Sequence, residues 1–241
     1  MSNEGFGQHI SRQYNEELED IRNRVMAMGG LVEQQLTNAI KALVEGDPEL
    51  GENVVSSDYR VNAMEVEIDE ECVQVLARRQ PAAGDLRLIM AVIKTITDLE
   101  RIGDEAERVG RMASQVHDGG TSLSISFASL EYMGQKVRDM LHNALDAFAR
   151  MDVEAAVKVW HEDTKVNKEY EGILRQLMTF MMEDPRSIPR ILDIIWAVRS
   201  LERVGDRATN ICEYVIYLVN GRDVRHITQD QMDISKLKKQ D

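Results

Sequence analysis

The sequence is poor in cysteine, proline and aromatic residues. It has two Cys and four Pro in 241 residues, and aromatic residues make up 5%. With only Cys72 and Cys212, and no C-x-x-C pair, neither a disulfide framework nor a zinc finger is indicated. Because 43% of the residues are hydrophobic and 29% are charged, the composition is that of a folded helical protein rather than a disordered or fibrous one.

Positive charge and long apolar runs are also scarce. Lys and Arg number 29 against 42 Asp and Glu, which gives a net charge of −13. A polyanion is a poor general binder of nucleic acid, because phosphate groups are neutralised by a surplus of cations. No stretch of about 18 apolar residues is present, and the first residues lack a basic start followed by an apolar segment. We therefore expect a cytoplasmic protein that is neither secreted nor spans a membrane.

Three segments recur in the same order in the two halves of the chain. LTNAIKALVEGD at 36–47 matches LHNALDAFARMD at 141–152, which lies 105 residues later. LERIGD at 99–104 matches LERVGD at 201–206, which lies 102 residues later. Between these segments, DYRVN in the first half matches DTKVN in the second. Duplication of one unit explains all three matches.

Each unit is predicted to form three helices, because its apolar residues recur at steps of three and four and nothing favours strands. Asp47 and Asp152 are predicted N-caps. The turn-rich segment 117–122 is the predicted junction of the units. The expected helices cover residues 10–45, 48–79, 83–116, 126–150, 153–183 and 188–220. The prediction is an all-α fold of two tandem three-helix bundles related by internal duplication, at 1–120 and 121–224, with a polar C-terminal tail at 225–241.

The third helix of each unit has carboxylates where its apolar stripe should continue. In both units a Glu is followed four residues later by an Asp, so two like charges share one helix face and repel each other. The preceding helix adds an Asp and an Asn at the same spacing. Antiparallel packing brings about four oxygen donors together in each unit, and such donors suit Mg, Mn or Fe. The predicted metal ligands are Asp58, Asn62, Glu100 and Asp104 in the first unit and Asp163, Asn167, Glu202 and Asp206 in the second.

The alternative interpretation of these charges is a solvated helix face, which Arg101 or Arg203 would neutralise locally. In that case the repeats serve packing alone, and no metal binds. Glu65 is a weaker candidate ligand, because the residue at its place in the second unit is Tyr170. Glycine is costly inside a helix, so the glycine in each LER-[IV]-GD motif is expected to permit close helix approach beside the site. Both cysteines are expected to be buried thiols.

An enzyme is not favoured by the sequence. None of the five histidines follows a Glu at i+3, as a ferritin-like di-iron oxidase requires, and there is no phosphate-binding loop or nucleophile-base constellation. We therefore expect no catalytic residues and no cofactor other than metal ions. The rival hypothesis is a carboxylate-bridged metalloenzyme, either an oxidase or a phosphate-ester hydrolase, in which clustered ions activate water.

These motifs together resemble the PhoU family of bacterial phosphate-uptake regulators. The resemblance rests on LERIGD and LERVGD, DYRVN and DTKVN, MGGLVEQQL, RQPAAGDLR and YEGILRQLMTFMMED, and covers about residues 10–224. It implies paired three-helix bundles, each with a multinuclear metal site formed by Glu/Asp-x-x-x-Asp motifs. Asn62 and Asn167 depart from that pattern by replacing Asp, so lower metal affinity or nuclearity is expected.

The resemblance also implies a role that no spacing could indicate. It implies a negative regulator of the phosphate-starvation response, the Pho regulon, and of phosphate uptake. Such a regulator acts as an adaptor between the ATPase subunit of the phosphate ABC transporter and the phosphate-sensing histidine kinase. The expected protein is a cytoplasmic homodimer that reaches the membrane only through these partners and binds no nucleic acid.

Overall fold

The computed structural model describes residues 4–79, 81–117, 127–227 and 232, and within these ranges the regular structure is entirely helical. Residues 118–122 of the predicted junction and most of the predicted C-terminal tail lie outside the described residues. The helices of the first unit are α1 (Glu4–Glu45), α2 (Pro48–Ser57), α3 (Tyr59–Arg79) and α4 (Ala83–His117). Those of the second are α5 (Ala128–Arg150), α6 (Val153–Glu183), the 3₁₀ helix η1 (Pro185–Ser187) and α7 (Ile188–Asn220).

The predicted helix ends agree with local cap chemistry. The Asp47 carboxylate accepts a hydrogen bond from the Leu50 backbone N–H at 3.0 Å, and Asp152 accepts one from Ala155 at the same distance. Both predicted N-caps are therefore confirmed. The residue at the preceding helix end has a left-handed backbone in both units, with φ of 69° at Gly46 and 54° at Met151.

The single helix predicted over 48–79 is wrong in one respect, because it is interrupted at Asp58, between α2 and α3. The hydroxyl of Ser56 donates to the Asn53 carbonyl at 3.3 Å, and that of Ser57 donates to the Val54 carbonyl at 3.0 Å. Such bonds from serine to the preceding turn compete with the helix and bend it. The second unit has His161 and Glu162 at these places, and α6 runs through without a break.

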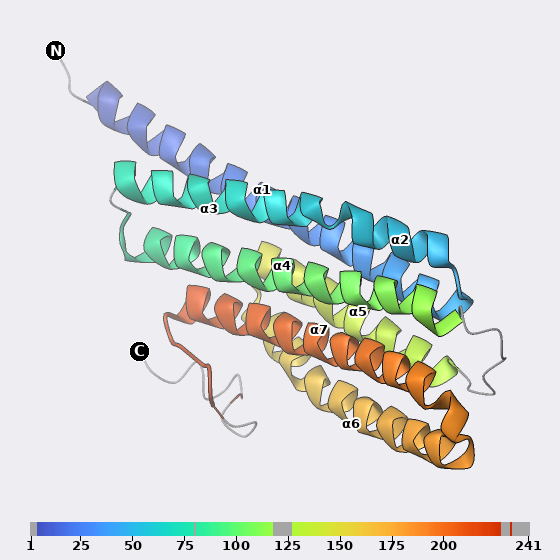
Figure 1. Ribbon diagram of the computed structural model, residues 1–241. Coiled ribbons are helices and arrows are strands. Elements are labelled where there is room, and N and C mark those ends of the chain that lie inside the picture. Colours follow the sequence, from blue (N-terminus) through green and yellow to red (C-terminus); the bar gives the residue numbers. More distant parts are fainter. Residues whose placement is uncertain (1–3, 80, 118–126, 228–231, 233–241) are drawn as a thin grey trace.

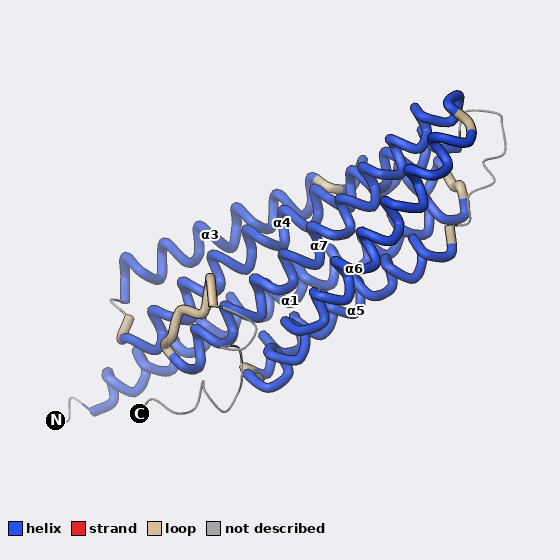
Figure 2. Tube along the Cα trace, turned by 90° about the horizontal axis from the view of Figure 1, so that it is seen from below, coloured by secondary structure: helices blue, strands red, loops and turns tan. Residues whose placement is uncertain are grey.

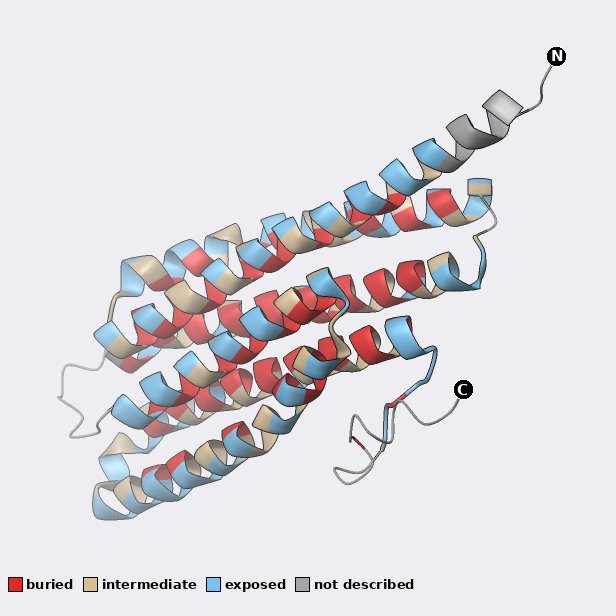
Figure 3. Cartoon of the chain, turned by 180° about the vertical axis from the view of Figure 1, so that it is seen from behind, coloured by how far each residue is buried: buried red, intermediate tan, exposed pale blue. Residues whose placement is uncertain are grey.

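The two units lie side by side as long, nearly parallel rods (Figure 1, Figure 2). The third helices, α4 and α7, form the main seam between the units, and α1 packs against α5 along a second seam. Their buried side chains form one continuous apolar core, and Figure 3 shows the buried positions concentrated along α4 and α7. Each carboxylate motif therefore lies on a helix that the other unit also holds in place.

A short part of the predicted polar tail is packed rather than solvated. Met232 is fully buried, and its carbonyl oxygen lies 3.2 Å from Nε2 of His161 on α6. None of the described helices is both long enough and apolar enough to cross a bilayer.

Candidate metal centres

The candidate site of the first unit lies where the interruption between α2 and α3 meets α4. Asp58 occupies the interruption itself and is 8% exposed, while Asn62 is one turn further along α3. The Asn62 amide donates to Oδ2 of Asp58 at 3.0 Å. The other oxygen of Asp58, Oδ1, is buried and has no hydrogen-bond partner. A buried charged oxygen without a partner is costly, so the site favours a proton or a cation there.

Gly103 on α4 permits this close approach, as predicted. A Cβ atom at this position would lie 3.1 Å from Oδ1 of Asp58 and 3.3 Å from Cγ1 of Val61. At Gly205 the corresponding contacts, with Oδ1 of Asp163 and Cγ1 of Val166, are both 3.5 Å, which is ordinary van der Waals separation. A Cβ would therefore be crowded at Gly103 but not at Gly205.

The carboxylates of the first site repel one another. Burial raises the pKa of Glu100, and the negative charges of Asp104, Glu65 and Asp58 add to the effect. Burial also raises the pKa of Asp58, where Asp104 and Glu107 contribute in the same direction. Burial is also the main cause of the raised pKa of Asp104, and the positive charge of Arg108 partly opposes this rise. The predicted residues are thus brought into one negative field, which also includes Glu65 and Glu107.

The candidate site of the second unit is formed by α6 and α7. The Asn167 amide donates to Oδ2 of Asp163 at 2.8 Å, while Oδ1 of Asp163 and Oε2 of Glu202 are buried and have no partner. Burial raises the pKa of Asp163 to about 6, and the charge of Asp206 contributes. Partial burial also raises the pKa of Glu202 and of Asp206, although Asp206 as a whole residue is exposed. The four predicted residues of this unit therefore also lie together.

Neutralisation of Glu202 comes from a residue that the sequence analysis did not single out. Nη1 of Arg199, three residues earlier on α7, lies 2.8 Å from Oε1 of Glu202. Arg203, the predicted alternative, contacts Glu105 on α4 at 3.1 Å, across the seam between the units, and its charge also lowers the pKa of Glu202 and of Asp206. Arg101 is exposed, and its charge lowers the pKa of Glu100, as the alternative interpretation predicts. Arg199 could have been found by comparing the units, because its counterpart in the first is Thr97.

Gln35 on α1 is the second residue that sequence reasoning missed. It is 4% exposed, and its Oε1 is buried without a partner. That oxygen lies 3.6 Å from the position a Cβ on Gly103 would take, on the same side as Oδ1 of Asp58. Its place in a long amphipathic helix gave no signal, but the equivalent residue in the second unit is the apolar Met140.

The oxygen donors fit a hard cation but are not assembled around one. Among the buried acceptors without partners, the carboxylate oxygens of the predicted ligands Asp58, Asp163 and Glu202 are groups that a cation would satisfy. Across the described ranges, however, no three His, Cys, Asp or Glu side chains stand close enough together to hold a metal ion. A bound cation would therefore have to draw the carboxylates of adjacent helices inward.

A buried polar network holds α4 against α7 beside these sites. Asp98 is 2% exposed and accepts hydrogen bonds from the Tyr214 hydroxyl at 2.7 Å and from Asn210 at 3.3 Å. Nη1 of Arg207 is 3.4 Å away. The counterpart of Asp98 in the second unit is Ser200, so only one half of the seam has this charge. The network locks the relative position of the two units.

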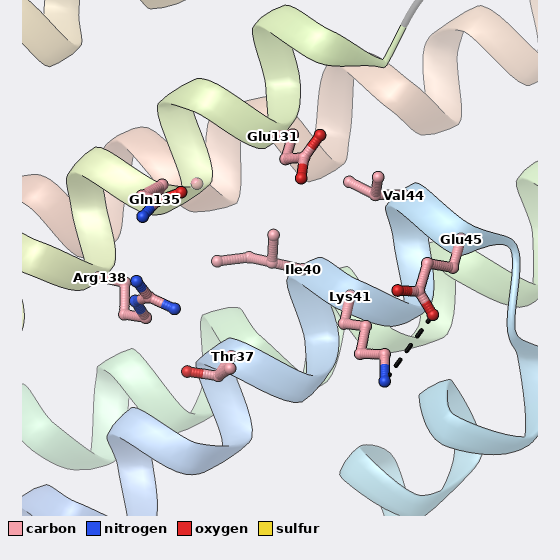
Figure 4. A pocket seen from close by; sticks show the side chains of 9 residues that line it. Thr37, Ile40, Lys41, Val44, Glu45, Glu131, Gln135 and Arg138 are labelled. Carbon is pink, nitrogen blue, oxygen red and sulfur yellow. Dashed lines mark ion pairs between the residues drawn. The ribbon is translucent and has the colours of Figure 1, made fainter.

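Two further features are separate from the carboxylate sites. Cys72 and Cys212 are buried, as predicted, and burial raises the pKa of the Cys72 thiol to about 12, which makes it unreactive. A cavity of about 160 Å³ lies between α1 and α5. Figure 4 shows Ile40 and Val44 beside the Lys41–Glu45 ion pair, whose charged atoms are 3.8 Å apart. None of the eight predicted metal ligands lines this cavity.

Comparison with known proteins accounts for both units. The sequence-family model of the PhoU domain matches residues 25–113 in the first unit and 130–215 in the second. The phosphate-specific transport system accessory protein PhoU of Serratia marcescens is 53% identical over 233 residues, covering 97% of this chain and 95% of that protein. The Escherichia coli K12 protein of the same description is 51% identical over 237 residues, covering 97% and 96%.

Solved structures give the same result. The crystal structure of PhoU from Pseudomonas aeruginosa superimposes with a TM-score of 0.84 at 53% identity, covering 87% of this chain and all of that one. The crystal structure of the phosphate transport system regulatory protein PhoU from Streptococcus pneumoniae superimposes with a TM-score of 0.81 at 26% identity. The match covers 88% of this chain and 99% of that one. The predicted all-α fold of paired helical repeats is confirmed, and the chain belongs to the PhoU family.

Proposed function

We propose that this protein is the accessory regulator of a phosphate-specific transport system, and that it restrains both phosphate uptake and the phosphate-starvation response. The observation that carries the proposal is the match of both repeats, over 97% of the chain, to proteins described as accessory to that system. In this role it is a cytoplasmic adaptor, active as a homodimer. It connects the ATPase subunit of the phosphate ABC transporter with the phosphate-sensing histidine kinase, and meets the membrane only through these partners.

The adaptor role requires no catalysis by this chain. Its two units share one core and a charged seam, so the molecule is a single long body with exposed helix faces. Such a body suits simultaneous contact with two partners. The transporter and kinase would then be coupled through binding energy, with phosphate supply changing which complex is favoured.

Metal ions belong to the proposal as structural ligands. Asp58, Glu100 and Asp104 would hold a cation between α2, α3 and α4, and Asp163, Glu202 and Asp206 would hold one between α6 and α7. The Asn62 and Asn167 amides would orient their neighbouring Asp side chains, to which they already donate. Oxygen ligands of this kind favour Mg, Mn or Fe. A bound ion would supply the positive charge that these carboxylates of adjacent helices lack, and would stiffen the adaptor.

The regulatory role is tested in a strain that lacks the gene for this chain. Such a strain should express phosphate-scavenging enzymes in phosphate-rich medium, and the wild-type gene should repress them. If metal stiffening is needed, Glu100→Ala with Glu202→Ala should repress less, at equal protein level. Glu70→Ala with Glu183→Ala, which removes two exposed carboxylates away from the sites, is the matched control. Repression that is absent even with the wild-type gene would refute the regulatory proposal.

A further inference from the structure

Helix α3 has an apolar stripe on the side that faces solvent. Positions 59, 63, 66, 70, 73 and 77 alternate steps of four and three residues, which places their side chains on one line along the helix. All six residues are exposed, and all except Glu70 are apolar or aromatic: Tyr59, Ala63, Val66, Val73 and Ala77. Tyr59, Val66 and Val73 are 69%, 56% and 54% exposed. This outer stripe has the residue spacing of a seam between two helices.

Packing within the chain does not use the outer stripe. Helix α3 lies at the edge of the first unit and packs mainly against α1 and α4 (Figure 1). It makes these contacts through its opposite face, where Val61, Ile68, Cys72 and Val75 are buried. A helix with apolar residues on a second face is suited to pack against a second neighbour. The outer stripe covers about five helical turns, or about 27 Å, which is the length of a helix of about 18 residues.

The charge beside the middle of the outer stripe is strongly negative. Residues 65–71 contain five carboxylates and no basic residue. Two of these carboxylates pair with Arg24 on α1. Asp69 and Glu70 remain exposed, with Glu70 on the stripe itself and Asp69 directly beside it. A partner whose basic residues meet these two turns is therefore favoured electrostatically, and an acidic partner is repelled.

The second unit does not repeat this surface. The equivalent positions of α6, which lie 105 residues later, hold two basic residues, one acidic residue and only two apolar ones: Thr164, Lys168, Glu171, Arg175, Met178 and Met182. Arg175 is thus the counterpart of Glu70, and Glu171 is that of Val66. Because both helices complete the same three-helix unit, the fold itself requires neither the apolar stripe nor its negative charge. The first unit therefore has the outer stripe in addition to what its packing needs.

We infer that the outer stripe of α3 is a docking surface for a basic amphipathic helix of another protein. The partner helix would place apolar side chains against Tyr59, Val66 and Val73, and Lys or Arg side chains against Asp69 and Glu70. The apolar contacts at regular spacing supply the affinity, while the charges select the partner and its register. This inference deepens the adaptor part of the proposed function and rests on it, because it names the surface that one partner would use.

The test uses the full-length protein and two fluorescein-labelled helical peptides of about 20 residues, with binding followed by fluorescence anisotropy. Both peptides have Leu at the a and d positions, and the flanking positions are Lys in the basic peptide and Glu in the acidic one. The basic peptide should bind about tenfold more tightly, and this preference should fall as salt is raised. Val66→Asn with Val73→Asn should weaken its binding by about tenfold or more, because the apolar centre of the seam is lost. Asp69→Asn with Glu70→Gln should weaken it about fivefold and reduce its salt dependence.

The matched control is Met178→Asn with Met182→Asn, which removes two exposed apolar residues from the equivalent helix of the second unit. This control should leave binding of the basic peptide within about twofold of the wild type. Circular dichroism checks that each variant keeps its helical fold, and sedimentation velocity reports its oligomeric state.

Equal binding of the two peptides, or equal losses in the α3 variants and the α6 control, would overturn the inference, because the attraction would then be general rather than confined to the outer stripe. A changed oligomeric state in Val66→Asn with Val73→Asn would also overturn it and would show that the stripe joins copies of this chain. In cells, this variant should repress phosphate-scavenging enzymes less than the wild type at equal protein level, and full repression would overturn the docking role. Absence of repression with the wild-type gene would instead refute the proposed function, while the peptide measurements still decide whether the stripe binds a basic helix.

Discussion

The two equivalent glycines beside the carboxylate sites should respond unequally to the same substitution. Gly103→Ala would place a Cβ 3.1 Å from Oδ1 of Asp58 and 3.3 Å from Cγ1 of Val61, so these side chains would have to give way by a few tenths of an ångström. Gly205→Ala would place a Cβ 3.5 Å from its neighbours, where it fits without movement.

The expected magnitudes follow from two opposing effects. Replacing Gly by Ala inside a helix stabilises the folded state by about 1 kcal/mol. Overpacking a filled contact costs about 1–3 kcal/mol. Gly205→Ala gains only the first effect and should raise the free energy of unfolding by about 1 kcal/mol. Gly103→Ala combines both effects, so its free energy of unfolding should lie about 1–3 kcal/mol below that of Gly205→Ala.

The assay is urea unfolding of the metal-stripped protein, followed by circular dichroism, with the midpoint and the slope fitted for both variants. A shift in midpoint at constant slope reports stability alone. Equal midpoints for the two variants, or a higher midpoint for Gly103→Ala, would falsify the close approach of Asp58 to α4. The same result would remove the steric reason for a glycine in the first site.

Three further predictions concern the helix ends, the seam and the second site. Met151→Gly should stabilise the protein by about 1 kcal/mol in thermal or urea unfolding, because Met151 has φ of 54° and the equivalent residue of the first unit is Gly46. Unchanged stability in this variant would contradict backbone strain at this helix end. Tyr214→Phe removes the donor 2.7 Å from buried Asp98 and should cost about 1–3 kcal/mol, and an unchanged urea midpoint would show that the bond contributes nothing. Because burial raises the pKa of Asp163 from 3.8 to about 6, its proton stabilises the folded, metal-free state fully below about pH 4, and this contribution is lost as the pH rises through about 6. Asp163→Asn should therefore stabilise the metal-free protein at pH 7 by at most about 3 kcal/mol. In this variant the free energy of unfolding should change less between about pH 4 and 7. If it changes as steeply as in the wild type, a group other than Asp163 is titrating.

The fold could be predicted from the sequence because its signals are local and occur twice. Asp47 and Asp152 cap equivalent helices through bonds to residues three positions later, and such bonds depend on spacing alone. The interruption at Asp58 was missed, although Ser56 and Ser57 were visible in the sequence. Serine in a helix either bonds back to the preceding turn or faces solvent, and only the packed structure shows which it does.

The site could be predicted only along single helices. Glu100 and Asp104 were found because four residues separate them on one face, whereas Gln35 approaches the same face from α1, at a sequence distance that no periodicity reports. Arg199 was overlooked for a different reason. A lone arginine on a helix usually lies on a solvated surface, and its contact with Glu202 depends on the side-chain conformation rather than on the helix period.

The differences between the two units carry functional information that their similarity does not. The residues that LERIGD and LERVGD share are those that let each helix pack and that place its carboxylates on one face. Gln35 and Arg199 lie at positions where packing alone would accept the other unit's residue, since Met140 fills the place equivalent to Gln35 and Thr97 that equivalent to Arg199. Both differences change the charge or polarity around a cluster of buried carboxylates, where electrostatic effects are strongest. In a duplicated bundle, such positions are therefore where two sites of common origin come to differ in their electrostatics.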